Sequence, residues 1–266
     1  MPTRGAPLYR RAIDESWRSL VGWSLGVAAA LLLYLPLYPS LGGDSQMQDL
    51  MATLPPALVN TLGYTLTTGA GYTQSTFYGL IGFVLVVIAA TAWGTGAIAG
   101  DEEKGTLELV LAHGVSRRQV VLERTAAIVT RLGWLGLLSG VIVLALNDAA
   151  KLDIDIANLL AAIAAWVGVA LVSATCALAA GALTGRRVFA TAAGAGIAVV
   201  GYSLNAVANQ SPNFDALHSF SPYAWAFENS PLVDGVDWLG LGLLYGLSAA
   251  LVVVAVVALR RRDIAS

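Results

Sequence analysis

The segment DEEKGTLELVLAHGVSRRQVVLER, residues 101–124, lies between two long stretches that carry almost no charge. Its charged side chains are Asp101, Glu102, Glu103, Lys104, Glu108, Arg117, Arg118, Glu123 and Arg124. Uncharged apolar stretches of this length are typical of helices that cross a membrane. The sequence therefore predicts two spanning helices joined by a charged connection, which is placed to contact a partner in water.

Similar apolar stretches recur along the whole chain of 266 residues, of which 57% are hydrophobic and only 12% charged. A soluble domain carries about 25% charged residues, whereas a helix that crosses a hydrocarbon core needs roughly 20 apolar residues. Lipid offers backbone polar groups no hydrogen-bond partner, so we expect the spans to be helices. The alternation of apolar and polar residues that is typical of a membrane β-barrel is absent. We predict an all-α integral membrane protein, a single domain over 1–266, with transmembrane helices at 20–38, 77–99, 128–146, 159–183, 188–207 and 239–259.

Lysine and arginine are distributed unevenly between the two sides of this six-span arrangement. Of the 15 such residues, only Lys151 falls on the second side. Positively charged loops remain in the cytoplasm, so we expect a multi-pass protein of the cell membrane whose termini and 101–124 connection are cytoplasmic. The basic residues follow the membrane edge and form no single patch, which favours membrane lipids, and no nucleic acid, as partners.

The polar segment before the first span carries Tyr9, Ile13 and Trp17 at intervals of four residues. This spacing places them on one face of a helix, so we predict an N-terminal interfacial helix over residues 1–19. The alternative is a simple basic flank that anchors the first span. No small-residue cleavage site ends the apolar run, so we do not expect a cleaved signal peptide.

Two segments on the outer side have patterns of their own. Residues 39–76 contain leucine and methionine at helical spacing, which predicts two short amphipathic helices. Residues 208–238 are rich in aromatic residues and proline. That composition fits either a short interfacial or re-entrant excursion or a plain aromatic belt, and the sequence leaves both open.

Within the charged connection, residues 101–114 have the pattern of a helix. The acidic residues at 101–103 favour a helix start, and Gly114 suits the left-handed conformation that ends one. Leu107, Val110 and Leu111 share one face of that helix. Ser116 and Gln119 predict a capping box at the start of the next helix. A solvated charged loop is the alternative, but an apolar face needs something to bury against.

This connection resembles the segment that follows the second span of ABC-2 type transporter permeases. The residues that carry the resemblance are Glu102-Glu103-Lys104-Gly105-Thr106-Leu107-Glu108-Leu109-Val110-Leu111-Ala112 and then Val115-Ser116-Arg117. His113 stands where many relatives have threonine or another small residue. Two weaker elements follow in the family's order, namely Ser221-Pro222-Tyr223-Ala224-Trp225 and Arg260-Arg261-Arg262-Asp263-Ile264.

The resemblance implies a coupling helix at residues 101–114 that sits in a groove of an ATP-hydrolysing subunit. It also implies an ABC exporter with two ATPase subunits and a second copy of this permease or a homologous one. ATP and magnesium would then bind to the partner ATPase, and this chain would bind no cofactor. The residues expected to dock on the ATPase are Glu103, Gly105, Thr106, Leu107, Glu108, Leu111 and Ser116. The apolar spans, and relatives of this short form, favour a lipophilic or amphipathic cargo such as a drug, antibiotic or lipid.

Several functions are disfavoured by residues that the sequence lacks. A phosphate-binding loop needs Gly-Lys-Ser/Thr, but Lys104 precedes Gly105 and Lys151 precedes Leu152, so we expect no catalytic site here. The spans hold no Asp, Glu, Lys or His at depth, and Arg131 lies near an inner edge, which argues against ion-driven carriers and metalloenzymes. The remaining alternative is a non-ABC membrane scaffold or a stand-alone channel or carrier.

Overall fold

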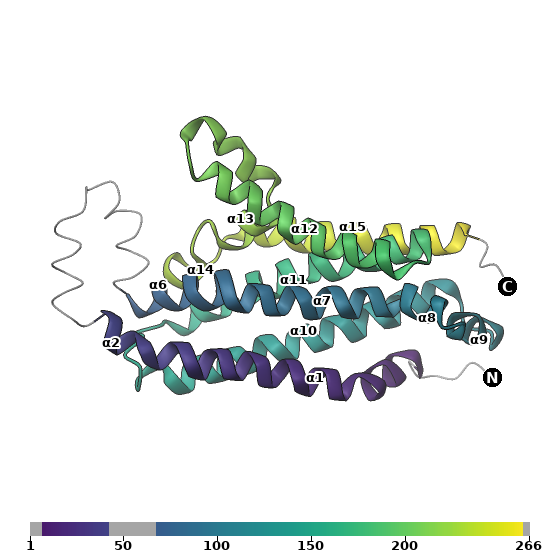
Figure 1. Cartoon of the computed structure of the whole chain (residues 1–266), viewed down its shortest axis with the longest axis horizontal. Helices are drawn as coiled ribbons and strands as arrows, with labels where there is room; N and C mark the ends of the chain where they lie inside the picture. Colours follow the sequence, from purple (N-terminus) through teal and green to yellow (C-terminus); the bar gives the residue numbers. More distant parts are fainter. Residues whose placement is uncertain (1–6, 43–67, 263–266) are drawn as a thin grey trace.

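The computed structural model describes residues 7–42 and 68–262, and all regular structure in these two ranges is helical. Six helices there are long and apolar enough to cross a membrane, which confirms the predicted fold class. Figure 1 shows the long helices lying side by side along the length of the molecule. They are α1 (Pro7–Tyr34), the run α6 (Gly69–Thr73), η3 (Gln74–Ile81) and α7 (Gly82–Ala97), and then α10 (Arg117–Asn147), α11 (Ile156–Thr184), α12 (Arg187–Ala208) and α15 (Trp238–Arg261).

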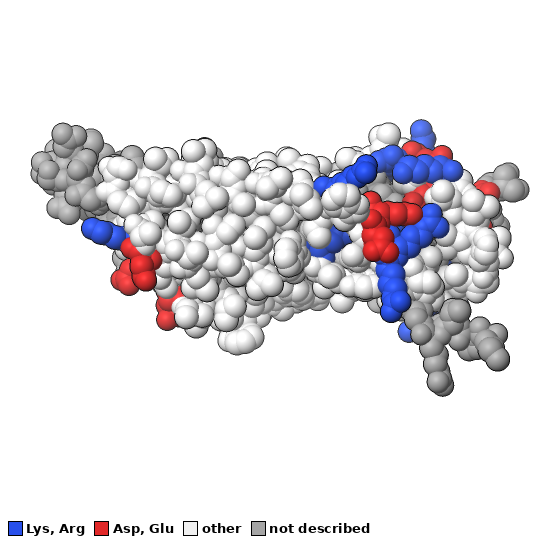
Figure 2. All heavy atoms as spheres, turned by 90° about the horizontal axis from the view of Figure 1, so that it is seen from below, with Lys and Arg blue, Asp and Glu red and all other residues white. Residues whose placement is uncertain are grey.

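Charge is concentrated at the two ends of the helices. On the face shown in Figure 2, a wide band without Lys, Arg, Asp or Glu separates the charged groups at the two ends. We call one of them the basic end, because it carries Arg10, Arg117, Arg118, Arg186, Arg187, Arg260 and Arg261. Lys151 lies in the turn between α10 and α11 at the opposite end. This distribution is the one expected of a bundle whose middle lies in lipid.

Helix α11 occupies the centre of the bundle, where it packs against α7, α10, α12 and α15. Small residues allow this close approach. A Cβ atom at Gly94 of α7 would come closer to the carbonyl oxygen of Ala174 than real Cβ atoms do, and one at Gly194 of α12 would lie 2.8 Å from the Ser173 oxygen. In the first half of α11, Trp166 is fully buried and packs against Phe77 and Tyr78. The centres of the Trp166 and Phe77 rings are 5.9 Å apart. Close backbone packing of this kind drives helix association where lipid removes the hydrophobic effect.

The separate interfacial helix expected over residues 1–19 is not found in the described part of that segment. Residues 7–34 form the single helix α1, which runs through the expected boundary without a break. Leu8 and Ala12 are buried against the bundle, whereas Trp17 of the predicted stripe is 56% exposed. The physical reason lies in α10, where the Glu123 carboxylate accepts a hydrogen bond from the Tyr9 backbone nitrogen at 2.9 Å.

The second spanning segment begins at Gly69, well before the expected start at residue 77. Thr68 caps it, since the Thr68 hydroxyl oxygen accepts a hydrogen bond from the Gly71 nitrogen at 3.0 Å. Gln74 is tolerated inside because its side-chain oxygen accepts a hydrogen bond from the Leu232 nitrogen at 3.1 Å. The two amphipathic helices expected within residues 39–76 fall mostly on 43–67, outside the described residues.

Residues 208–238 form three short helices: η4 (Pro212–Phe220), α13 (Pro222–Phe227) and α14 (Pro231–Asp234). Helix α13 packs against α11, α12 and α15. It is fixed by two side chains, since the Ser221 hydroxyl donates to the Gly201 oxygen at 2.6 Å and the Tyr223 hydroxyl to the Gly79 oxygen at 2.7 Å. Helix α13 is therefore packed into the bundle, whereas η4 has no buried residue and exposes Phe214 and Phe220.

Replacing Gly94 by alanine tests the contact between α7 and α11. The added methyl group has no room beside Ala174, so we expect stability to fall by about 1–3 kcal/mol in thermal unfolding of the detergent-purified protein. Gly133→Ala is the control, because a Cβ there meets no atom within 4 Å and the gain in helix propensity is the same. Equal melting temperatures for the two variants would contradict this packing.

Candidate functional site

The connection between α7 and α10 lies at the basic end and consists of two short helices, α8 (Ala99–Glu103) and α9 (Thr106–Ala112). The single helix expected over 101–114 is thus wrong. Gly105 divides it by adopting the left-handed conformation at φ +69°, which is strained for residues that have a Cβ. The Thr106 hydroxyl donates to the Asp101 oxygen at 2.9 Å and fixes the angle between the two helices. The expected end is confirmed, since Gly114 follows α9 with φ +80°.

Ser116 starts α10 as expected, but only half of the capping box forms. Its hydroxyl oxygen accepts a hydrogen bond from the Gln119 nitrogen at 3.2 Å. The Gln119 side chain does not return to Ser116, because its amide donates to the Glu123 carboxylate at 2.7 Å. The Glu123 carboxylate therefore accepts two hydrogen bonds, one from Gln119 in the first turn of α10 and one from the Tyr9 nitrogen of α1.

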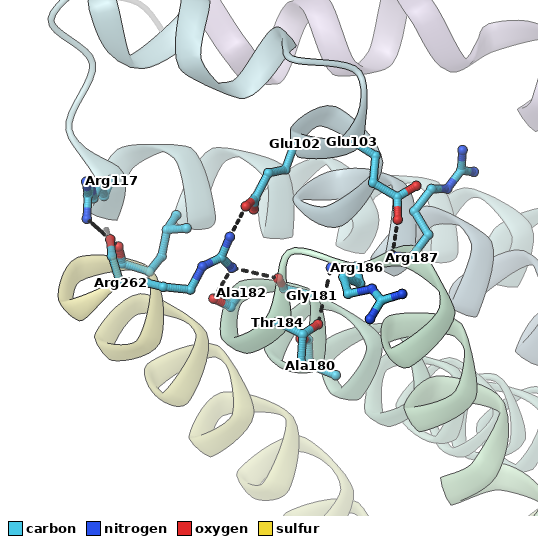
Figure 3. Close-up of polar contacts among 11 residues, drawn as sticks. Glu102, Glu103, Arg117, Ala180, Gly181, Ala182, Thr184, Arg186, Arg187 and Arg262 are labelled. Atoms are coloured by element: carbon cyan, nitrogen blue, oxygen red, sulfur yellow. Dashed lines mark hydrogen bonds and ion pairs between the residues drawn. The ribbon is translucent and has the colours of Figure 1, made fainter. Parts of the chain in front are cut away.

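The three acidic residues of α8, which we call the carboxylate cluster (Asp101, Glu102 and Glu103), bind three different helices. Asp101 pairs with Arg124 of α10. Glu102 pairs with Arg262, directly after α15, and Glu103 accepts a hydrogen bond from the Arg187 nitrogen at the start of α12 at 2.8 Å. Figure 3 shows Glu102 and Glu103 pointing toward these partners from the same short helix. The cluster thus holds the connection on three independent elements.

Two arginines extend this network to the ends of α11 and α15 (Figure 3). Arg262 donates to the Ala182 oxygen at 3.0 Å, near the end of α11. Arg117, at the start of α10, donates to the Leu259 oxygen at 2.9 Å and to the Arg262 oxygen at 2.5 Å. Guanidinium groups at these positions satisfy carbonyl groups left free at helix ends and match the negative end of the helix dipole.

The two ion pairs of the network are partly buried, with side chains that are 12–22% exposed. Burial raises the pKa of Asp101, while the positive charge of Arg124 acts in the opposite direction. Burial also lowers the pKa of the Arg262 guanidinium. The second carboxylate oxygen of Glu102 is buried and has no hydrogen-bond partner among the described residues. Such pairs fix geometry, because separating them would leave a charge without a partner in a poorly solvated place.

Some of the expected docking residues face the bundle, and others face the surface. Leu107 is only 1% exposed and packs into the core, so it cannot be presented to a partner. Leu111 is half-buried against the same core. The Glu103 and Thr106 side chains are bound within the chain. Gly105, Glu108 and Ser116 are exposed, and the Ser116 hydroxyl bonds to the backbone of its own helix, α10.

Leu109 is the docking candidate that the sequence reasoning missed. It is 63% exposed and lines a groove of about 510 Å³ between α9 and the start of α1. Thr106, Val110, His113 and Val115 line the groove from the connection, with Pro7, Leu8 and Arg11 from α1. The signal was present in the sequence, because the face shared by Leu107, Val110 and Leu111 leaves Leu109 on the opposite side of the helix.

A comparison with protein families decides what this arrangement belongs to. The family model described as "ABC-2 family transporter protein" matches residues 6–264. The chain belongs to the ABC-2 transporter family. It is therefore a permease, the multi-pass membrane subunit of an ABC transporter, and the family works with an ABC ATPase. A search of curated proteins gives no significant match.

In the permease, Arg262→Gln tests whether the network stabilises the connection. The change removes the partner of Glu102, so we expect a loss of about 1.5–3 kcal/mol, the range for hydrogen bonds to charged groups. Thermal unfolding of the purified permease measures it, together with faster proteolysis between α8 and α9. The control is Arg260→Gln, which removes the charge of an exposed arginine. If both variants unfold like the unmodified permease, the pair contributes nothing.

Proposed function

We propose that the permease exports a lipophilic or amphipathic compound across the cell membrane, driven by two ATPase subunits that bind ATP and magnesium. The observation that carries this proposal is the attachment of α8 and α9 to several spanning helices at once. The asymmetry of lysine and arginine supports a cytoplasmic position for the basic end and for both termini. An ATPase in the cytoplasm would then meet the connection directly.

The network gives this connection a mechanical role. A force applied to a loop is dissipated in its flexible backbone, whereas α8 is bound through the carboxylate cluster to α10, α12 and the end of α15. Closure of the ATPase subunits on ATP would displace α8 and α9 together with these helices. Alternating access follows if the helices reorient as a group about the central α11. A stand-alone channel or carrier has no need for such an attachment.

The exposed side of α9 supplies the docking contact in this proposal. Leu109 provides an apolar side chain, Glu108 a charge, and Gly105 an unobstructed backbone, since a Cβ there would meet no atom within 4 Å. The groove between α9 and α1 would receive a side chain of the ATPase. Leu107 serves the same contact indirectly, because its burial fixes the position of α9 on the bundle.

Leu109→Asp tests the docking contact and, with it, ATP-driven transport. A new charge at an exposed apolar contact leaves the permease folded but costs desolvation in the complex, so we expect at least about a tenfold loss of ATPase association. Co-purification of the two subunits and ATP-dependent transport of amphipathic compounds in proteoliposomes measure the effect. Leu109→Met, which keeps the apolar contact, is the control.

Transport that continues in Leu109→Asp without the ATPase would favour a stand-alone carrier. Loss of association in both Leu109 variants would show that shape at this position matters and apolar character does not. A substitution at Leu107 would be uninformative, because a charge there unfolds α9 from the bundle.

We further propose that two copies of the permease form the pathway between them, through the outward side of α7 and α12. A groove of about 360 Å³ runs along these helices and is lined almost entirely by apolar side chains, among them Val84, Ile88, Val199 and Tyr202. Val84 is 47% and Val199 64% exposed. A twofold interface uses the same surface on both copies, and a groove of this kind suits a lipophilic cargo.

A cysteine pair tests this face, because Cys176 is the single cysteine of the chain. In a Cys176→Ala background, we expect Val84→Cys to form a dimer with a short bifunctional thiol reagent, since each copy presents the position to the other. Leu25→Cys, on α1 and 65% exposed, is the control and should remain monomeric. Denaturing gel electrophoresis reads the outcome, and cross-linking at Leu25 alone would assign the interface to α1.

A further inference from the structure

A small crevice near the basic end lies between α1, α7 and α10, apart from the docking groove. It has a volume of about 160 Å³, and its polar lining comes from Glu15, Ser16, Asp101, Arg124 and Arg131. Trp93 and the small residues Ala92 and Gly96 complete the wall on α7. Figure 2, which shows the α1 side, displays the charged end beside the uncharged band, and the crevice belongs to the helices that meet there.

Arg131 is the most deeply buried charged group of this crevice, with only 7% of its surface exposed. One guanidinium nitrogen, Nη2, donates to the Ala12 oxygen at 3.0 Å. The guanidinium carbon lies 5.4 Å from the centre of the Trp93 ring. Its Nε atom is buried without a hydrogen-bond partner in the described part of the chain, and no carboxylate there pairs with the side chain.

The acidic residues around the crevice do not compensate this charge, because each has an arginine of its own. Glu15 pairs with Arg11 at 2.6 Å, and Asp101 pairs with Arg124. Arg131 therefore brings one net positive charge into a poorly solvated place. A buried charge is tolerated when an opposite charge and hydrogen bonds accompany it, and a carbonyl and an aromatic ring supply only part of that.

We propose that the crevice binds the phosphate group of a phospholipid, with Arg131 as its ligand. Arginine presents its donors in a planar fork that matches phosphate, and it retains its charge when buried. The lining joins charged residues near the basic end to uncharged residues of the spanning helix α7, which is the transition expected at the level of lipid phosphates in a bilayer.

The surroundings favour a lipid over a free anion. The α7 wall of the crevice is formed by Ala92, Trp93, Gly96 and Ala97, and a Cβ added at Gly96 would meet no atom within 4 Å, so this position faces open space. Acyl chains can lie there, whereas a free phosphate would gain nothing from it. We choose phosphatidylethanolamine as the probe, because it presents a phosphate together with two acyl chains. This inference does not depend on the transported compound.

Lipid-dependent thermal stability of the detergent-purified permease tests the proposal. We expect phosphatidylethanolamine to raise the melting temperature, and diacylglycerol with the same acyl chains or inorganic phosphate to leave it unchanged. Arg131→Gln should weaken binding of phosphatidylethanolamine by about tenfold or more, the loss of one charge-assisted contact. Arg118→Gln, an exposed arginine on the same helix, should bind the lipid like the unmodified permease.

Two further variants keep the test decisive if Arg131→Gln does not fold. Arg131→Lys keeps the charge and should retain part of the binding. Ser16→Phe keeps Arg131 but fills the crevice from α1, and it should reduce the phosphatidylethanolamine that co-purifies, as counted by native mass spectrometry. Equal stabilisation by diacylglycerol would overturn recognition of the phosphate. Equal stabilisation by inorganic phosphate, or unchanged binding in Ser16→Phe and the Arg131 variants, would overturn the lipid site.

Discussion

The rest of the structure at the basic end depends on three carboxylates that follow one another on a single helical turn. Successive residues of a helix point in different directions, so Asp101, Glu102 and Glu103 reach α10, the end of α15 and the start of α12, respectively. Each contact alone is modest. Together they define one orientation of α8 and leave no rotation of the connection that preserves all three.

The centre of the bundle is held together differently from the basic end, because polar groups are few there and the helix backbones come close to one another. Helix α11 meets its neighbours through glycine, alanine and serine, as at Gly94 and Gly194. Packing of this kind is short-ranged, so it tolerates little separation of the helices but allows them to move as a unit. The centre of the permease is tightly packed, and one end carries the polar network. Its exposed apolar side chains lie on the outside, at α9 and along α7 and α12.

Much of the architecture could be predicted from the sequence, because apolar length and the placement of lysine and arginine determine the spans physically. The end of α9 at Gly114 and the cap at Ser116 were also predictable, since each depends on one residue in its own turn. The division at Gly105 was not, because Gly-Thr also fits a continuous helix until Thr106 is seen to bond to Asp101. Arg131 illustrates the same limit, because its contacts with the Ala12 oxygen and the Trp93 ring join three helices and cannot be read from its own turn.

The pairing of Glu102 with Arg262 joins residues separated by 160 positions. During synthesis, Glu102 is made 160 residues before Arg262, so the carboxylate gains this partner only after α15 has been made. Until α15 has been inserted, the attachment of the connection between α7 and α10 is therefore incomplete. A chain arrested before α15 would leave the Glu102 carboxylate without its arginine, and α8 would be held by two contacts instead of three.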